Sequence, residues 1–340
     1  MNAVPSQFND THHTGRGRAF SMTELLVVIA IIAVLAGILL VALKGVRERA
    51  LATQTRATMQ GFSKACDSFQ IEHGRYPGII PETILAANPE ISGTENALLD
   101  MMGGVIRGDD PRYDEAPFNG WQEIIINDTD LGKIRVNKQL IGNGPEINGR
   151  PYSPYFTPKG DELVVAKGQG SECCDCDPPV GPCLPDLIDA WGQPIVFVRR
   201  ARAVGPLVGD PVDAAPQFMV GTILPYVTST ALGEFGRNQV YNASDNPGGS
   251  ILAGPSLYDR DATFAQIIRH PSFGEPDEPL TGTARGAYVL ISAGKDGIYF
   301  SRKDGPGTPA VPVSNIINHP EFGNPQVVEE YDDIRLFGGG

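Results

Sequence analysis

Four cysteines lie close together near the middle of the chain, within the sequence SECCDCDPPVGPC. They are Cys173, Cys174, Cys176 and Cys183. Thiols at such short spacing can form disulfides, with Cys183 paired to one of the other three, although spacing alone does not fix which one. Two other interpretations stay open: a zinc or other thiolate metal site, whose usual paired CxxC spacing is not matched here, and a lipid or redox role. We favour disulfides, which are common in domains outside the cytoplasm.

Acidic residues gather in two stretches near the C-terminus. A strand-like run that begins at Tyr288 leads into the turn GKDG, which contains Asp296, and Asp304 follows it. Asp332 and Asp333 form the second stretch. Carboxylate oxygens are ligands that calcium prefers, whereas without a cation such acids lie solvated in Asx-type turns. Both interpretations stay open on these residues alone.

The histidines form no catalytic pattern with other residues. None of them lies at a motif spacing from a serine, a cysteine or a carboxylate, and they are His12, His13, His73, His270 and His319. We therefore expect a protein that is not an enzyme. The net charge of -13 also argues against nucleic acid as a partner, because phosphate binding needs clustered lysine and arginine.

The longest element that could position these residues is apolar. Every residue from Leu25 to Leu43 is apolar or glycine, and as a helix this run is about 30 Å long, which matches the hydrocarbon core of a membrane. We interpret Phe20–Leu43 as a transmembrane helix. Glu24 lies at its start, where a lone carboxylate facing lipid is costly, so Glu24 needs a partner.

The residues before this segment set its orientation. Arg16 and Arg18 precede it, so this short flank stays in the cytoplasm and the bulk of the chain lies on the other side. A secretory signal peptide has an apolar region of about 7–15 residues followed by a small-residue cleavage site. Here the helical sequence continues past the apolar run without such a site, so we expect the segment to be retained.

The sequence RAFSMTELLVVIAII, which begins at Arg18, resembles the class III signal of type IV pilins and of the pseudopilins of type II secretion systems. The resemblance implies that a prepilin peptidase cleaves between Ala19 and Phe20 and methylates the new amino group. The family usually has glycine where this chain has Ala19. Glu24 would become the fifth mature residue and would neutralise the α-amino group of its own or a neighbouring subunit. The alternative is a Glu24 solvated among the lipid headgroups, with no role.

An amphipathic pattern follows the apolar run. From residue 44 to residue 74 the apolar and small residues recur with helical spacing, among them Phe62, Cys66 and Phe69. Gly74 and the proline that follows end the helix, in a sequence that resembles the end of the pseudopilin helical spine. We expect one helix from about residue 21 to residue 73, with Cys66 buried as a small hydrophobic residue.

The rest of the chain, residues 75–340, is predicted to be a head of short elements separated by many Gly, Pro and Asp residues. The predicted elements are a helix over 95–102 and strands over 121–126, 163–166, 195–198 and 288–292. The sequence DAWGQP, which contains Trp191, resembles the turn that opens the pseudopilin sheet, and we expect Trp191 to be a core residue. Relative to that family the head carries insertions at about 78–185 and 201–283.

The acidic stretches also resemble a family feature. In major pseudopilins, similar elements bind a calcium ion that ties down the terminal loop. The resemblance implies that Asp296 and Asp333 are the calcium ligands, with backbone carbonyls completing the shell. Asp304 and Asp332 are acidic neighbours without a matched position.

The sequence therefore predicts an α+β, pilin-like fold in which a long N-terminal helix packs by its distal half on a small antiparallel sheet. Its divisions are a cleaved leader, a transmembrane and assembly segment, an amphipathic spine and an extracytoplasmic head, over residues 1–19, 20–43, 44–74 and 75–340.

By resemblance, the function is structural. We expect a pseudopilin subunit of a type II secretion or type IV pilus-like fibre that serves protein transport. Its partners would be copies of itself or sibling pseudopilins, the prepilin peptidase, the inner-membrane assembly platform and membrane lipid. It would cross the inner membrane once, with its head in the periplasm or outside. The alternatives are a minor pilin or pseudopilin, and an extracytoplasmic binding domain on a pilin-like anchor.

Overall fold

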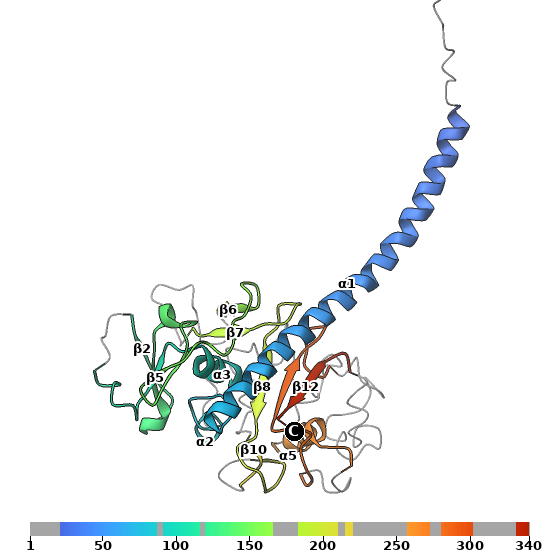
Figure 1. Cartoon of the computed structure of the whole chain (residues 1–340). Coiled ribbons are helices and arrows are strands. Elements are labelled where there is room, and N and C mark those ends of the chain that lie inside the picture. The colour runs from blue at the N-terminus through green and yellow to red at the C-terminus, as the bar shows by residue number, and fades with distance from the viewer. Residues whose placement is uncertain are drawn as a thin grey trace, which may run out of the picture. The chain divides into compact units, whose positions relative to one another are not determined.

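The computed structural model of the chain (Figure 1) describes residues 21–86, 91–115, 120–165, 183–209, 215–219, 257–272, 280–301 and 331–339. The chain divides into two compact units, Met1–Arg49 and Ala50–Gly340. Helix α1, Met22–His73, begins in the first unit and ends in the second. These bounds confirm the prediction of a single long helix.

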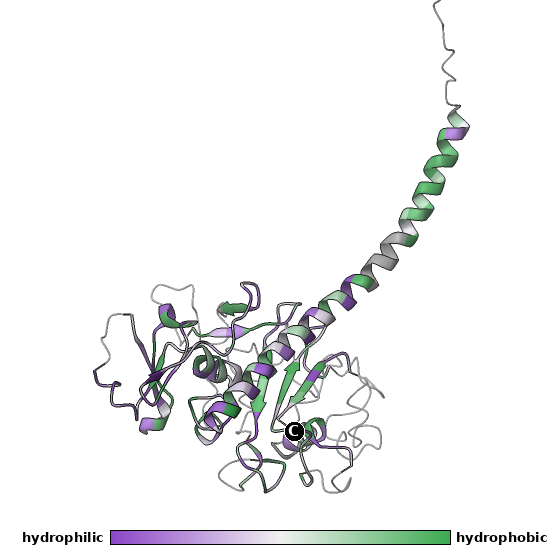
Figure 2. Cartoon of the chain, viewed as in Figure 1, coloured by the Kyte–Doolittle hydropathy of each residue, from purple (hydrophilic) through white to green (hydrophobic). Residues whose placement is uncertain are grey.

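In the first unit, helix α1 exposes large apolar side chains in succession, from Leu25 at 55% exposure to Ile38 at 65%. Figure 2 shows this part of α1 as hydrophobic. Within the described residues, no helix combines the length and the apolar character of a membrane span. Phe20 and the side chains of residues 39–43, which belong to the predicted segment, lie outside the described residues. The transmembrane helix stays a prediction.

In the second unit, several short elements follow α1. The helices are α2 (Glu82–Leu85), α3 (Gly93–Met102) and α5 (Leu257–Ile268), with 3-10 turns at Asp130–Gly132 and Lys138–Leu140. The strands are β1 (Val105–Arg107), β2 (Gln122–Ile125), β3 (Lys133–Val136), β4 (Glu146–Ile147), β5 (Arg150–Pro151), β6 (Leu163–Val165), β7 (Pro185–Leu187), β8 (Ile195–Arg199), β9 (Val208–Gly209), β10 (Phe218–Met219), β11 (Tyr288–Ser292) and β12 (Ile334–Gly338).

The central sheet has the strand order β12-β11-β8, and both pairings are antiparallel. The remaining strands form small sheets: β1-β3-β2, β4-β5 and β6-β7 are antiparallel, and β9-β10 is parallel. This mixture of helices and small, mostly antiparallel sheets is compatible with the predicted α+β class. The predicted helix and strands also appear, each within a few residues of its expected bounds.

Both faces of the central sheet are buried, and successive residues of a strand point to opposite faces. On one face, Phe197 and Tyr288 pack with Phe62 of α1, and the ring centroids of Phe62 and Phe197 are 5.4 Å apart. On the other face, Val198 and Val289 pack in a cluster that includes Phe264 of α5. Burial on both sides explains why these strands read as continuous apolar runs in the sequence.

Helix α3 is joined to the edge strand β8 through Thr94. The Thr94 hydroxyl donates to the carbonyl of Ile195 at 2.6 Å and accepts from the amide of Phe197 at 2.9 Å. The helix begins with a capping box, in which the Ser92 side chain accepts from the Glu95 amide and the Glu95 carboxylate accepts from the Ser92 amide. The two bonds of Thr94 satisfy edge groups of β8 that would otherwise be open.

We expect Phe62→Ala to lower the free energy of unfolding by about 3–5 kcal/mol, because it leaves a cavity between α1 and the sheet. Ile71→Ala is the matched control, since Ile71 lies on the same helix but is 81% exposed, and it should change stability by less than about 0.5 kcal/mol. Chemical denaturation of the full detergent-solubilised chain measures both. Equal losses in the two variants would contradict the packing described.

Candidate functional site

The first candidate site is the start of helix α1, where Ser21 and Glu24 form a capping box. The amide of Ser21 donates to Oε2 of Glu24 at 2.8 Å, and the Ser21 hydroxyl donates to the same oxygen at 2.8 Å. In return, the Glu24 amide donates to the Ser21 hydroxyl oxygen at 3.2 Å. Glu24 therefore has a partner within its own chain. Ala19 and Phe20, the predicted processing residues, lie outside the described residues.

Sequence reasoning looked for the partner of Glu24 in a new amino group and overlooked Ser21. The signal was present, because Ser-x-x-Glu ahead of an apolar run is the sequence pattern of a capping box. Thr23 lies beside the pair, with its hydroxyl 3.0 Å from that of Ser21.

The second candidate site is formed by the two acidic stretches, which the structure brings together. The amide of Lys295 donates to Asp332 at 3.2 Å, and the amide of Phe300 donates to both carboxylate oxygens of Asp333 at 2.9 Å. Asp296 accepts from the amide of Ile298 at 2.8 Å, within its own turn. Asp304 lies outside the described residues.

The electrostatics of this site centre on Asp333, which is buried. Burial raises the pKa of Asp333 well above its usual value, and the nearby negative charges of Asp332 and Asp296 raise it further. The amide of Phe300 and the charge of Arg335 oppose this shift. A desolvated carboxylate with two acidic neighbours has the chemistry of a hard-cation ligand. Among the described residues, however, no group of three His, Cys, Asp or Glu side chains lies close enough together to hold a metal ion.

The turn that contains Trp191 is bonded to Ser292, the last residue of β11 before the acidic turn. Asp189 accepts from the amides of Trp191 and Gln193 at 2.9 Å, and from the hydroxyl of Ser292 at 2.7 Å. Gly192 has a φ of 83°, a left-handed conformation that favours glycine. Trp191 is half-buried and packs against the cluster that contains Phe62, so it is a core residue only in part.

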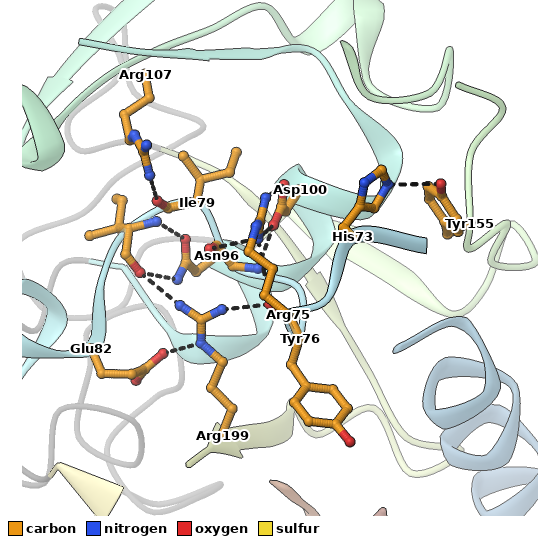
Figure 3. A network of polar contacts seen from close by, with 12 residues as sticks. His73, Arg75, Tyr76, Ile79, Glu82, Asn96, Asp100, Arg107, Tyr155 and Arg199 are labelled. Atoms are coloured by element: carbon orange, nitrogen blue, oxygen red, sulfur yellow. Dashed lines mark hydrogen bonds and ion pairs between the residues drawn. The ribbon is translucent and has the colours of Figure 1, made fainter. Parts of the chain in front are cut away.

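A third polar network holds the loop that leaves helix α1 (Figure 3). Arg75 forms a two-bond ion pair with Asp100 of α3, and the amide of Gly78 donates to the same carboxylate at 2.7 Å. Asn96, one turn earlier on α3, exchanges two hydrogen bonds of 2.9 Å with the backbone of Ile80. Helix α3 thus supplies partners for the buried backbone of the loop.

Strands β8 and β1 complete this network. Arg199 of β8 pairs with Glu82 and donates to the carbonyls of Tyr76 at 2.8 Å and Ile80 at 3.1 Å. Arg107 of β1 donates to the carbonyl of Ile79 at 2.7 Å. Two arginines far away in the sequence therefore hold the same loop as α3 does.

A cleft of about 650 Å³ lies beside this loop, between the end of α1, α3, β1 and β4. Its arginines are ion-paired with carboxylates of the same cleft: Arg75 with Asp100, Arg107 with Asp109, and Arg112 with Asp110 and Glu146. Each of these three arginines is thus paired within the cleft, where four carboxylates face them.

The cysteines are described only in part. Cys183 is disulfide-bonded, and Cys66 is free and fully buried, which raises the pKa of its thiol. The remaining cysteines, Cys173, Cys174 and Cys176, lie outside the described residues.

Comparison with known proteins gives one informative similarity. A fimbrial protein of Neisseria meningitidis serogroup B is 28% identical to the chain over 89 residues, which are 26% of this chain and 52% of that protein. The chain thus spans about half the length of this relative. No protein-family model matches, and no solved structure matches. The similarity is to a pilus-type protein.

We expect Asp100→Ala to lower the free energy of unfolding by about 1–3 kcal/mol, because it leaves the buried amide of Gly78 without an acceptor. Asp109→Ala is the control. It also removes one carboxylate from an arginine, but Asp109 is 41% exposed and the loss should stay below about 1 kcal/mol. Denaturation and the hydrogen exchange of the Gly78 amide measure the effect, and unchanged exchange in Asp100→Ala would contradict this role.

Proposed function

We propose that the chain is a structural subunit of a pilus-type fibre, most similar to the pseudopilins of type II secretion systems, and that it assembles through the first part of helix α1. The observation that carries this proposal is the succession of exposed apolar side chains from Leu25 to Ile38. The distant similarity to a fimbrial protein supports it.

The apolar run needs to be covered. Burial of apolar surface is favourable by roughly 25 cal/mol per Å², so this part of α1 is stable in lipid or against helices of other subunits and unstable in water. Helix α1 is continuous from Met22 to His73. One element therefore carries both the apolar run and Phe62, which packs on the central sheet of the head.

Processing would create the charge that assembly uses. Cleavage between Ala19 and Phe20 leaves an α-amino cation at Phe20, about one helical turn from Glu24. The pairing of this cation with Glu24 of the same or a neighbouring subunit would neutralise both groups where water is scarce. The partners of the chain would then be copies of itself or sibling subunits, the prepilin peptidase, the assembly platform and inner-membrane lipid.

Co-expression with a prepilin peptidase and the assembly machinery tests this proposal. Mass spectrometry should find a product that begins at Phe20 and carries a methyl group on its new amine. Glu24→Ala should be processed but should lose about tenfold or more in cross-linked assemblies, because each unpaired charge left in the apolar core costs several kcal/mol or so. Glu48→Ala, on the same helix beyond the apolar run, is the matched control and should assemble normally.

A chain that keeps its first 19 residues in the presence of the peptidase would overturn the proposal. A chain that is cleaved and anchored but never cross-links to other copies would favour the alternative of an anchored binding domain. Cross-links to sibling subunits, at low abundance relative to them, would identify a minor subunit.

We also propose that the acidic site around Asp333 takes up a calcium ion. The support is the burial of Asp333, whose ionised form the negative charges of Asp332 and Asp296 make still more costly without a cation. Asp296 and Asp333 would be the carboxylate ligands, and the bound charge would relieve the repulsion within the site.

The pH dependence of stability tests this second proposal. Because the pKa of Asp333 is raised in the folded chain, its contribution to stability without calcium is full below about pH 3.9 and is lost as the pH rises through the raised pKa. With excess chelator at neutral pH, we therefore expect Asp333→Asn to melt at a higher temperature than the wild type. With calcium the order should reverse. Asp128→Asn, which alters an exposed acid, should show neither change, and a wild type unaffected by calcium would refute the site.

A further inference from the structure

The capping box at the start of α1 uses only one of the two carboxylate oxygens of Glu24. Both donors, the amide and the hydroxyl of Ser21, reach Oε2. Among the described residues Oε1 accepts no hydrogen bond, and the Glu24 side chain is exposed. An ionised carboxylate has about four lone-pair sites, so half of its accepting capacity stays available.

The described side chains in the same turn as this carboxylate are neutral. Ser21, Met22 and Thr23 share its turn, and the sequence has no lysine or arginine between Arg18 and Lys44. Thr23 can donate its hydroxyl proton to Ser21, which leaves the hydroxyl proton of Ser21 directed at Glu24. Once cleavage has removed the leader with Arg16 and Arg18, a cation for Oε1 has to come from the new amino terminus or from another molecule.

We propose that Ser21 is a positioning residue for Glu24, which fixes Oε2 within the chain so that Oε1 faces outward and accepts the α-amino cation of an incoming copy. This inference rests on the proposed function. The two bonds from Ser21 hold the glutamate side chain in one conformation before the partner arrives, so less side-chain freedom is lost on pairing. They also partly satisfy the carboxylate in the unassembled chain, where it would otherwise be exposed to lipid alone.

Substitutions at position 21 can separate this role from ordinary helix capping. Ser21→Thr keeps the hydroxyl and both functions. Ser21→Ala removes both. Ser21→Asp caps a helix about as well as serine, but its carboxylate cannot donate to Glu24 and repels it.

The experiment measures inter-subunit cross-links of the full chain, normalised to processed protein by mass spectrometry. We expect the normalised cross-link yield of Ser21→Thr to stay within about twofold of wild type. The yields of Ser21→Ala and Ser21→Asp should fall about fivefold to tenfold, which corresponds to the loss of an interaction as strong as a helix cap. Normal assembly of Ser21→Asp would mean that Ser21 only caps the helix, and normal assembly of Ser21→Ala would mean that it has no role. Either result overturns the inference.

A second measurement does not depend on processing or assembly. In detergent micelles, the amide of residue 21 should exchange its hydrogen about fivefold to tenfold faster in Glu24→Ala than in wild type, because it loses its acceptor. Equal exchange would show that the contact is absent and would end the inference. If instead the wild type is not cleaved, or Glu24→Ala cross-links as well as wild type does, the proposed function fails, whatever the exchange data show.

Discussion

The packing of the distal part of α1 on the central sheet is the contact on which the rest of the head depends. Phe62 meets Phe197 of β8, and the Tyr288 hydroxyl of β11 lies within hydrogen-bonding distance of Ser63 and Asp67 of the same helix. The first contact excludes water and the second fixes the register of helix against strand. Helix α1 covers only one face of the sheet. The opposite face is also apolar and is covered by a second cluster, to which α5 contributes.

Once α1 is fixed on the sheet, the loop after His73 has to reverse direction while its backbone becomes buried. This requirement explains the density of charged side chains there. Asp100, Asn96, Arg199 and Arg107 reach the loop from α3, β8 and β1, and they take up the amides and carbonyls that neither helix nor strand can pair. The role of the network is therefore structural: it supplies hydrogen-bond partners to the buried backbone of the loop. The pairing of its charged side chains with one another agrees with this role.

The sequence predicted the helices and strands well, but it did not predict the contacts between residues that are far apart in the chain. Helical spacing predicted the bounds of α1 almost to the residue, and apolar runs predicted β8 and β11. Each of these patterns involves residues that are close to one another in the sequence. The loop network could not be read in the same way, since Arg199 and Glu82 meet only after the whole sheet has formed. The Ser21–Glu24 box is a different case. Its Ser-x-x-Glu pattern is local and predicts the contact. The sequence interpretation considered only an amino group, of its own or a neighbouring subunit, as the partner of Glu24 and did not consider Ser21.

The strand order β12-β11-β8 has a consequence for how the protein matures. The middle strand, β11, pairs with β8 from far upstream and with β12 from some forty residues downstream, so the sheet has no complete form until residues 334–338 have emerged. Contacts of such long sequence separation form slowly. During synthesis the apolar start of α1 therefore emerges while the head is still unfinished, and the edge of β11 that pairs with β12 stays open until the last strand is made.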